Sequence, residues 1–134
     1  MTHHSYGWDG LSPDAQQAVR GAGTVIGGAR HQGLIPADIS NFEVWPSPMK
    51  QLADKLPARS DEQICVLASG DPLFFGIGGH LSKIIPPDQI RIIPHFSVFT
   101  LICARMKWSA PDTACVTACG RPVENLHRAL FDKA

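Results

Sequence analysis

The clearest pattern of apolar and polar positions lies between Ile64 and Val98. Ile64–Ala68 is an unbroken apolar run, which predicts a short strand that is covered on both faces. Leu73–Ile85 has the composition and length of a helix, and a pair of prolines ends it. Gln89–Ile93 has three isoleucines among its five residues and predicts a second strand. Residues 64–98 therefore predict a core βαβ unit with parallel strands.

Strand and helix patterns alternate along the rest of the chain. The predicted strands are Thr24–Ile26, Phe42–Trp45 and a β-rich run at Thr113–Ala118, and the predicted helices are Leu11–Gly21, Ala29–Leu34, Met49–Leu56, Phe96–Trp108 and Val123–Phe131. This alternation is typical of an α/β fold, in which helices cover both faces of a mostly parallel sheet. We therefore expect an α/β architecture with helices on both faces.

The segment Ser69-Gly70-Asp71-Pro72 links the first predicted strand of the βαβ unit to its helix. An Asp before Pro at a strand-to-helix turn is typical of a helix N-cap. Ligands of open parallel sheets also bind beyond the carboxyl ends of the strands, where free N–H groups can hold an anionic group. Both interpretations of Asp71 stay open at this point, and they are compatible.

The glycines Gly76, Gly78 and Gly79 lie inside the predicted helix, after the turn. A phosphate-binding loop places its glycines before the helix, and neither G-x-G-x-x-G nor G-x-x-x-x-G-K-[ST] occurs in the sequence. The absence of these loops disfavours a phosphate- or flavin-binding domain. We expect these glycines to permit close packing of the helix instead.

Composition narrows the class of protein. The 134 residues are 44% hydrophobic, which is enough for the core of one domain. Twelve basic and twelve acidic residues balance, so the charge indicates neither a nucleic-acid partner nor a membrane surface. The sequence has no membrane-spanning apolar run and no cleavable leader, which predicts a cytoplasmic protein.

The metal-binding residue types have ordinary explanations. The cysteines are Cys65, Cys103, Cys115 and Cys119, in apolar surroundings and without Cys-x-x-Cys spacing. Buried free thiols are the favoured interpretation, with a metal site or a disulfide as alternatives. His3 and His4 could bind a metal, but their place at the chain terminus favours the interpretation that they belong to a frayed end. We therefore predict no metal site.

The run Ala68–Gly78, ASGDPLFFGIG, resembles the signature turn of the tetrapyrrole (corrin/porphyrin) methylases. Further segments resemble the same family: Gly7–Leu11, Val25–His31, Trp45–Met49, Ile93–Val98 and Cys103–Trp108. The set is most similar to the members that methylate carbon 5 of a precorrin in cobalamin biosynthesis. The resemblance covers residues 7–121, nearly the whole chain.

This resemblance implies S-adenosyl-L-methionine as cofactor and a precorrin tetrapyrrole as substrate. In the family the Gly-Asp turn and the turn after the next strand hold the methionine part of the cofactor. By position, the implied cofactor-binding residues are Trp8, Ser69, Gly70, Asp71, Phe74, Ser97 and Val98. Methyl transfer from a sulfonium needs alignment more than a strong base, and we assign no general base.

The chain departs from the family pattern at both ends. Met1–Tyr6 stands where the family has a hydrophobic first strand, and the sequence stops near the junction with a second domain. We therefore expect residues 1–134 to be an incomplete N-terminal methylase domain with a shortened first strand and no second domain. A missing C-terminal domain or a partner chain would complete the site. The alternative is a catalytically inactive α/β fragment or interaction module, with self-association into a homo-oligomer.

Overall fold

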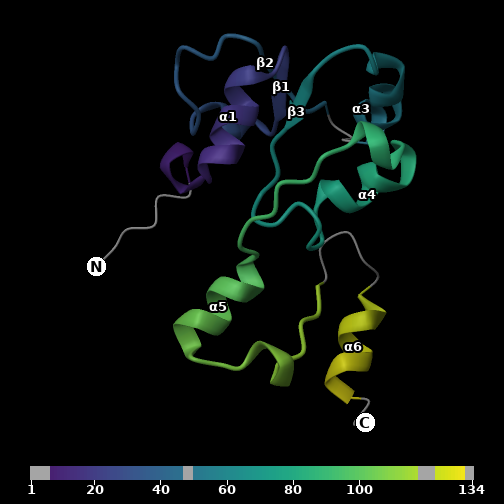
Figure 1. Ribbon diagram of the computed structural model, residues 1–134. Helices are drawn as coiled ribbons and strands as arrows, with labels where there is room; N and C mark the ends of the chain where they lie inside the picture. The colour runs from purple at the N-terminus through teal and green to yellow at the C-terminus, as the bar shows by residue number, and fades with distance from the viewer. Residues whose placement is uncertain (1–6, 47–49, 118–122, 132–134) are drawn as a thin grey trace. The chain divides into compact units, whose positions relative to one another are not determined.

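The computed structural model describes residues 7–46, 50–117 and 123–131 (Figure 1). It divides into two compact units, and the division falls between His95 and Phe96. The first unit contains a parallel sheet of three strands, β1 (Thr24–Gly27), β2 (Phe42–Val44) and β3 (Ile64–Val66), in the order β2-β1-β3. The predicted α/β class and the three strands of this sheet are confirmed.

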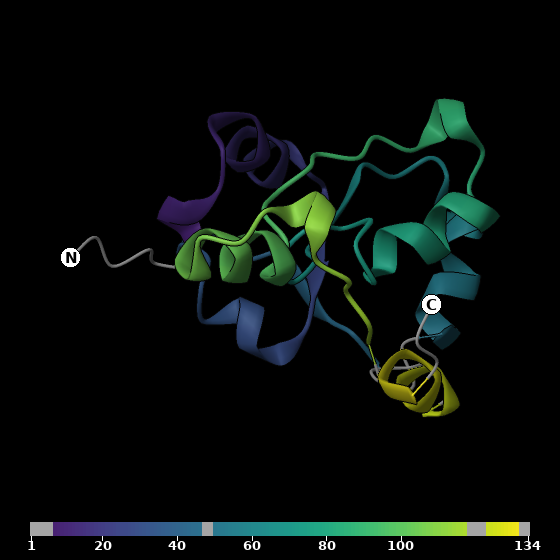
Figure 2. The same cartoon turned by 90° about the horizontal axis from the view of Figure 1, so that it is seen from below.

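Short helices connect the strands of the first unit. They are α1 (Pro13–Gly21), α2 (Ala29–Gln32), α3 (Lys50–Lys55) and α4 (Ile77–Ile84), with 3-10 turns at Trp8–Gly10, Leu56–Arg59 and Pro87–Gln89. Helix α1 lies within its predicted range Leu11–Gly21, and the Ser12 hydroxyl caps its start by accepting the N–H of Ala15 at 3.2 Å. In two views turned by 90°, α1 lies on one side of the strands, and α3 and α4 lie on the other (Figure 1, Figure 2).

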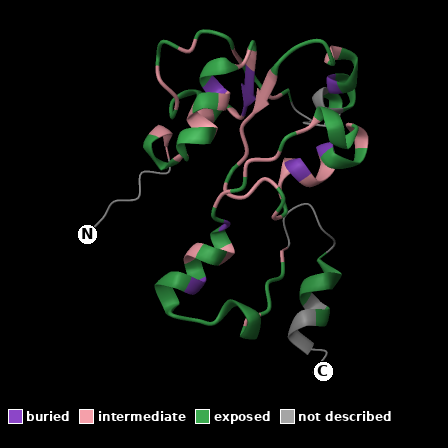
Figure 3. Ribbon diagram, viewed as in Figure 1, coloured by how far each residue is buried: buried purple, intermediate pink, exposed green. Residues whose placement is uncertain are grey.

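The core of the first unit is built on β1. Val25 and Ile26 are both 0% exposed, and consecutive residues of a strand point to opposite faces of a sheet. Both faces of the central strand are therefore covered. Ile26 packs with Leu56 and with Leu81 of α4, and Figure 3 colours β1 and short stretches of the helices of this unit as buried. Burial of these apolar side chains stabilises the sheet.

Helix α4 begins four residues later than the sequence predicts, at Ile77 instead of Leu73. Phe75 adopts φ 52°, in the left-handed region that interrupts a right-handed helix. The N–H of Gly78 then donates to the carbonyl of Pro72 at 2.9 Å, and a Cβ on Gly78 would lie only 2.6 Å from that oxygen. Gly76 and Gly78 thus pack closely against the preceding turn, whereas a Cβ on Gly79 would meet nothing within 4 Å, so the expected close packing is wrong for Gly79.

The second strand of the predicted βαβ unit is absent. Pro87–Gln89 form a 3-10 turn, and residues 90–97 contain no strand. A strand needs a ladder partner, and among the described residues β3 pairs with β1 alone, so its other edge offers no neighbouring strand. Ile90 instead packs against the core, and Arg91 pairs with Asp14 of α1.

The described residues of the second unit form two helices, α5 (Val98–Met106) and α6 (Glu124–Phe131), and a 3-10 turn at Ala110–Asp112. The Ser97 hydroxyl caps α5 by accepting the N–H of Thr100 at 3.0 Å. Both helices lie within their predicted ranges. The predicted β-rich run at Thr113–Ala118 forms no strand over residues 113–117, and Ala118 lies outside the described residues.

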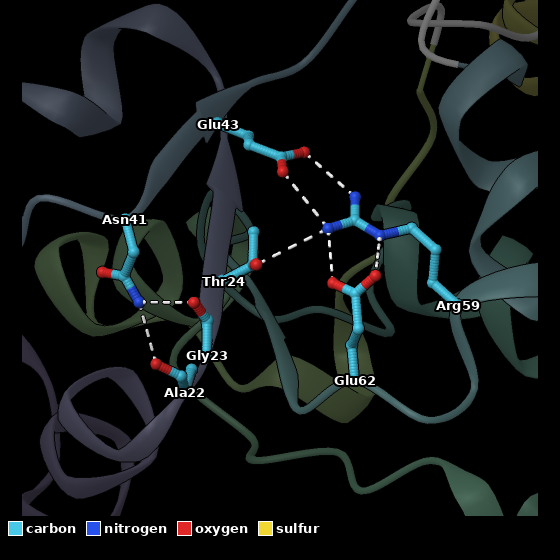
Figure 4. A network of polar contacts seen from close by, with 7 residues as sticks. All are labelled: Ala22, Gly23, Thr24, Asn41, Glu43, Arg59 and Glu62. Carbon is cyan, nitrogen blue, oxygen red and sulfur yellow. Dashed lines mark hydrogen bonds and ion pairs between the residues drawn. The ribbon is translucent and has the colours of Figure 1, made fainter.

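A network of ion pairs fixes the amino ends of the strands (Figure 4). The guanidinium of Arg59 donates to Glu62 at 2.7 and 3.0 Å and to Glu43 of β2 at 3.0 and 3.2 Å. These carboxylates raise the pKa of Arg59, and Arg59 lowers the pKa of Glu62. Beside it, the Asn41 amide donates to the carbonyls of Ala22 and Gly23, both at 2.8 Å.

Three of the cysteines fall within the described residues, and all three are free thiols. Cys103 is buried and Cys65 is half-buried, where burial raises the pKa of the Cys65 thiol. The prediction of burial is wrong for Cys115, which is exposed. The described residues do not include Cys119, His3 or His4. Among the described residues, no group of side chains could hold a metal ion, and no helix is long and apolar enough to cross a membrane.

Candidate functional site

The candidate site lies at the carboxyl ends of β1 and β3. The two strands are parallel neighbours, with Ile26 opposite Val66, so the segments that follow them leave the same edge of the sheet. The segment after β1 runs through Gly28 to the start of α2, and the segment after β3 is the Ser-Gly-Asp-Pro turn. Open parallel sheets place ligand-binding groups at this edge.

His31 is fixed against the end of β1. A Cβ on Gly27 would lie 3.0 Å from the His31 Nδ1, so a glycine leaves the room that this ring occupies. The Gly28 N–H donates to the same Nδ1 at 3.0 Å, which leaves the ring proton of neutral His31 on Nε2. Burial and, to a smaller extent, the charge of Arg30 lower the pKa of His31.

Arg30 and His31 reach across to the turn that follows β3. The Arg30 guanidinium donates to the Ser69 hydroxyl oxygen, and the His31 Nε2 lies 3.2 Å from the same oxygen. We call Arg30, His31 and Ser69 the edge cluster. Since the two nitrogens occupy the acceptor positions of the hydroxyl, its own hydrogen is directed elsewhere, to be donated to a further group.

The Gly-Asp turn is held by its own side chain. Gly70 adopts φ 72°, and the Asp71 Oδ1 accepts the N–H of Leu73 at 2.9 Å. The N-cap of α4 is Gly76, without a side-chain hydrogen bond, so the prediction that Asp71 caps this helix is wrong. Asp71 caps the turn instead, because Phe75 delays the start of the helix.

Two backbone donors of this turn are available to a ligand. Within residues 7–46, 50–117 and 123–131, the N–H groups of Gly70 and Asp71 donate to no protein acceptor. Hydrogen-bond donors directed at one place are suited to an anion such as a carboxylate. The turn and the edge cluster share Ser69, so their donors form one continuous group.

The structure brings four of the seven predicted cofactor residues together in this turn, namely Ser69, Gly70, Asp71 and Phe74. The Phe74 ring meets that of Phe75 edge to face, with 4.7 Å between centroids. Trp8 lies in the 3-10 turn Trp8–Gly10, where the Arg20 guanidinium carbon is 5.0 Å from its ring centroid. No described hydrogen bond or ring contact joins Trp8 to the turn.

The remaining predicted residues belong to the second unit. The Ser97 side chain is 5% exposed, and its oxygen serves as the cap of α5. Val98 is the first residue of that helix and is 66% exposed.

Sequence reasoning assigned no role to Arg30 and His31. The signal that identifies them is a Gly-Gly pair followed by two basic residues directly after a buried strand. That signal gains meaning only once β1 and β3 are known to be parallel neighbours, because the partner of both side chains lies 38 and 39 residues away in the sequence.

Comparison with known proteins points to one family. The family model for tetrapyrrole (corrin/porphyrin) methylases matches residues 7–134. A precorrin-6Y C(5,15)-methyltransferase (decarboxylating) of Sinorhizobium sp. is 35% identical over 86% of this chain and 28% of its own length. A cobalt-precorrin-7 C(5)-methyltransferase of Salmonella typhimurium is 35% identical over 84% of this chain and 56% of its own length.

A solved structure shares the fold. The crystal structure of a cobalamin biosynthesis precorrin-6Y methylase from Archaeoglobus fulgidus aligns with a TM-score of 0.67 and 23% identity, over 87% of this chain and 62% of that one. The chain thus spans between about a quarter and three fifths of the length of these relatives.

Proposed function

The chain belongs to the tetrapyrrole (corrin/porphyrin) methylase family, and from this premise we propose that it supplies the N-terminal part of the cofactor site of a methyltransferase. The proposed reaction is methyl transfer from S-adenosyl-L-methionine to a precorrin in cobalamin biosynthesis. Relatives named as methyltransferases of precorrin-6Y and cobalt-precorrin-7 support this substrate class.

The observation that carries the proposal is the pair of free N–H groups at Gly70 and Asp71, beyond the carboxyl end of β3. They suit the carboxylate of the methionine part of the cofactor. Ser69 and Phe74 flank them in the same turn. The family resemblance adds Trp8, Ser97 and Val98 to the cofactor site.

The cofactor, when bound, supplies an electrophilic methyl group on a sulfonium. The task of this chain is therefore to bind and orient, and alignment alone lowers the barrier of such a displacement. Gly70 and Asp71 would fix the methionine end through their N–H groups. The side chain of Asp71 would act indirectly, since its Oδ1 accepts the Leu73 N–H and so holds the turn in shape.

Calorimetric titration with S-adenosylhomocysteine tests the proposal, in a chain extended through the second methylase domain. We expect binding that Asp71→Arg abolishes, because the larger side chain cannot hold the turn. Asp88→Arg is the matched control, since Asp88 is exposed in the turn Pro87–Gln89. No binding, or binding unchanged by Asp71→Arg, would contradict the site.

The 134 residues alone should bind S-adenosylhomocysteine weakly, to an extent that calorimetry does not detect, and should not catalyse methyl transfer. The chain covers 56% of the length of the cobalt-precorrin-7 methyltransferase, so part of that protein has no counterpart here. Measurable methylation of a tetrapyrrole by the isolated chain would contradict this expectation.

A non-catalytic interaction module is the second candidate, and α5 favours it. Val98, Ile102 and Met106 follow one another at four-residue spacing on one helix face, and each is between 47 and 66% exposed. Contiguous exposed apolar side chains are typical of a surface that another protein covers. Self-association at concentrations of about 100 µM, measured by sedimentation, would support this candidate, and a monodisperse monomer would count against it.

A further inference from the structure

We propose that the edge cluster of Arg30, His31 and Ser69 is a carboxylate-binding site. This inference rests on the proposed function and deepens it, because it assigns a ligand group to Arg30 and His31, which the family resemblance left without a role.

Charge balance separates Arg30 from the other arginines of the first unit. Arg20 pairs with Asp38 and Arg91 with Asp14, and Arg59 pairs with two glutamates. Arg30 alone among these four has no carboxylate partner: it donates to the Ser69 hydroxyl, and no carboxylate of the described residues lies within ion-pair distance of it. A permanent cation is thus held in place without a counter-ion.

The donors around Ser69 are oriented before any ligand arrives. The Gly28 N–H fixes the ring of His31, and the His31 Nε2 and the Arg30 guanidinium both meet the Ser69 oxygen. A guanidinium carries five N–H groups in a planar fork, of which one direction is used here. Remaining N–H groups of Arg30 and the hydroxyl hydrogen of Ser69 are available to the two oxygens of one carboxylate.

The position of the cluster limits which carboxylate it can meet. Ser69 directly precedes Gly70, so a group bound here lies beside the proposed cofactor turn. Two ligands of the proposed reaction carry carboxylates: the cofactor, in its methionine part, and the precorrin, in the acid side chains around its macrocycle. Both present the same chemistry to Arg30, and the experiment below distinguishes them.

The experiment is an NMR titration of the full 134-residue chain, which detects affinities into the millimolar range. The probes are S-adenosylhomocysteine, methylthioadenosine (which lacks the carboxylate) and uroporphyrin, a tetrapyrrole with eight carboxylates. Arg30→Gln removes the charge and Ser69→Ala removes the hydroxyl. Arg91→Gln is the matched control, because it removes one exposed positive charge elsewhere in the same unit.

We expect Arg30→Gln to weaken one carboxylate probe about tenfold, as for loss of one charge-assisted contact, and Ser69→Ala to weaken the same probe by a smaller factor. Arg91→Gln should change each affinity less than twofold, and methylthioadenosine should bind all variants alike. Loss confined to S-adenosylhomocysteine assigns the site to the cofactor, and loss confined to uroporphyrin assigns it to the substrate.

Three results would overturn the carboxylate site. The first is equal affinities of wild type and Arg30→Gln for both carboxylate probes, and the second is no binding of either probe by the wild type. The third is equal weakening of methylthioadenosine, because that probe has no carboxylate to lose. Failure of the proposed function looks different. In that case the extended chain binds neither adenosine compound, while the response of uroporphyrin to Arg30→Gln still decides the site.

Discussion

An arginine lies at each end of the three-stranded sheet, and the two differ in whether a carboxylate neutralises their charge. At the amino ends, Arg59 meets the carboxylates of Glu43 and Glu62 and lies beside Thr24. At the carboxyl ends, Arg30 donates to the Ser69 hydroxyl and has no carboxylate partner among the described residues. Its charge also helps to lower the pKa of the neighbouring His31. One end is a closed set of donors and acceptors, and the other has donors in excess.

This difference separates stability from binding. A satisfied network holds elements together, and its donors are not free for a ligand. An excess of fixed donors contributes little to folding, and it is arranged for a group that the chain itself lacks. Ligands of open parallel sheets bind at the carboxyl edge, which is the edge with the excess here.

Both ends depend on β1, so the largest effect should come from its core. Ile26→Ala should lower the free energy of unfolding by about 3 kcal/mol, through lost burial and a cavity beside Leu56 and Leu81. Urea unfolding followed by circular dichroism measures the loss. Val44→Ala, on β2 at 47% exposure, is the control and should cost less than about 1 kcal/mol. Similar losses in both variants would contradict the placement of the core.

The second test compares the arginines directly. Arg59→Met leaves Glu43 and Glu62 without their shared partner and should lower the free energy of unfolding more than Arg30→Gln does, although the exposure of both carboxylates limits the loss. Arg30→Gln should cost less than about 0.5 kcal/mol, because it removes one hydrogen bond to an exposed serine. Equal losses, or a larger loss for Arg30→Gln, would remove the distinction between the two ends.

The sequence predicted the elements whose signals are local. The strand at Thr24–Ile26, the helix within Leu11–Gly21 and the helix end before the two prolines each depend on a few adjacent residues, and the structure confirms them. The Gly-Asp turn was likewise located at the end of a strand, as its composition indicates.

The elements that depend on distant residues were not predictable in the same way. The strand expected at Gln89–Ile93 has suitable residues, yet it lacks a ladder partner among the described strands. The role of Asp71 depended on the backbone of Phe75, since an aromatic residue gives no warning of a positive φ. The edge cluster required knowledge of which strands are neighbours, because Arg30 and Ser69 come from separate segments.

The third test uses acid. Arg59 lowers the pKa of Glu62 in the folded state below its ordinary 4.5, so the folded state binds fewer protons there than the unfolded state does. The resulting stability is complete above that ordinary value and is lost as pH falls through the folded pKa. The decrease in Tm between pH 6 and pH 3 should therefore be smaller in Arg59→Met than in wild type.

Some acid sensitivity should persist in Arg59→Met, because Arg20 lowers the pKa of Asp38 in the same direction. Arg30→Gln should follow the wild-type decrease in this acid range, since no described carboxylate pairs with Arg30. An equal decrease in Tm between pH 6 and pH 3 for Arg59→Met and wild type would show that the network at the amino ends does not control stability in acid.

The smallest effect should be seen at His31, by NMR titration of its ring protons. Its midpoint should lie below the ordinary 6.5, because burial and the Arg30 charge both disfavour the imidazolium. Arg30→Gln should raise the midpoint only in part, since burial is the larger cause and stays. Arg91→Gln should leave it unchanged. A midpoint unaffected by Arg30→Gln would mean that this guanidinium is electrostatically balanced, and the contrast between the two ends of the sheet would then disappear.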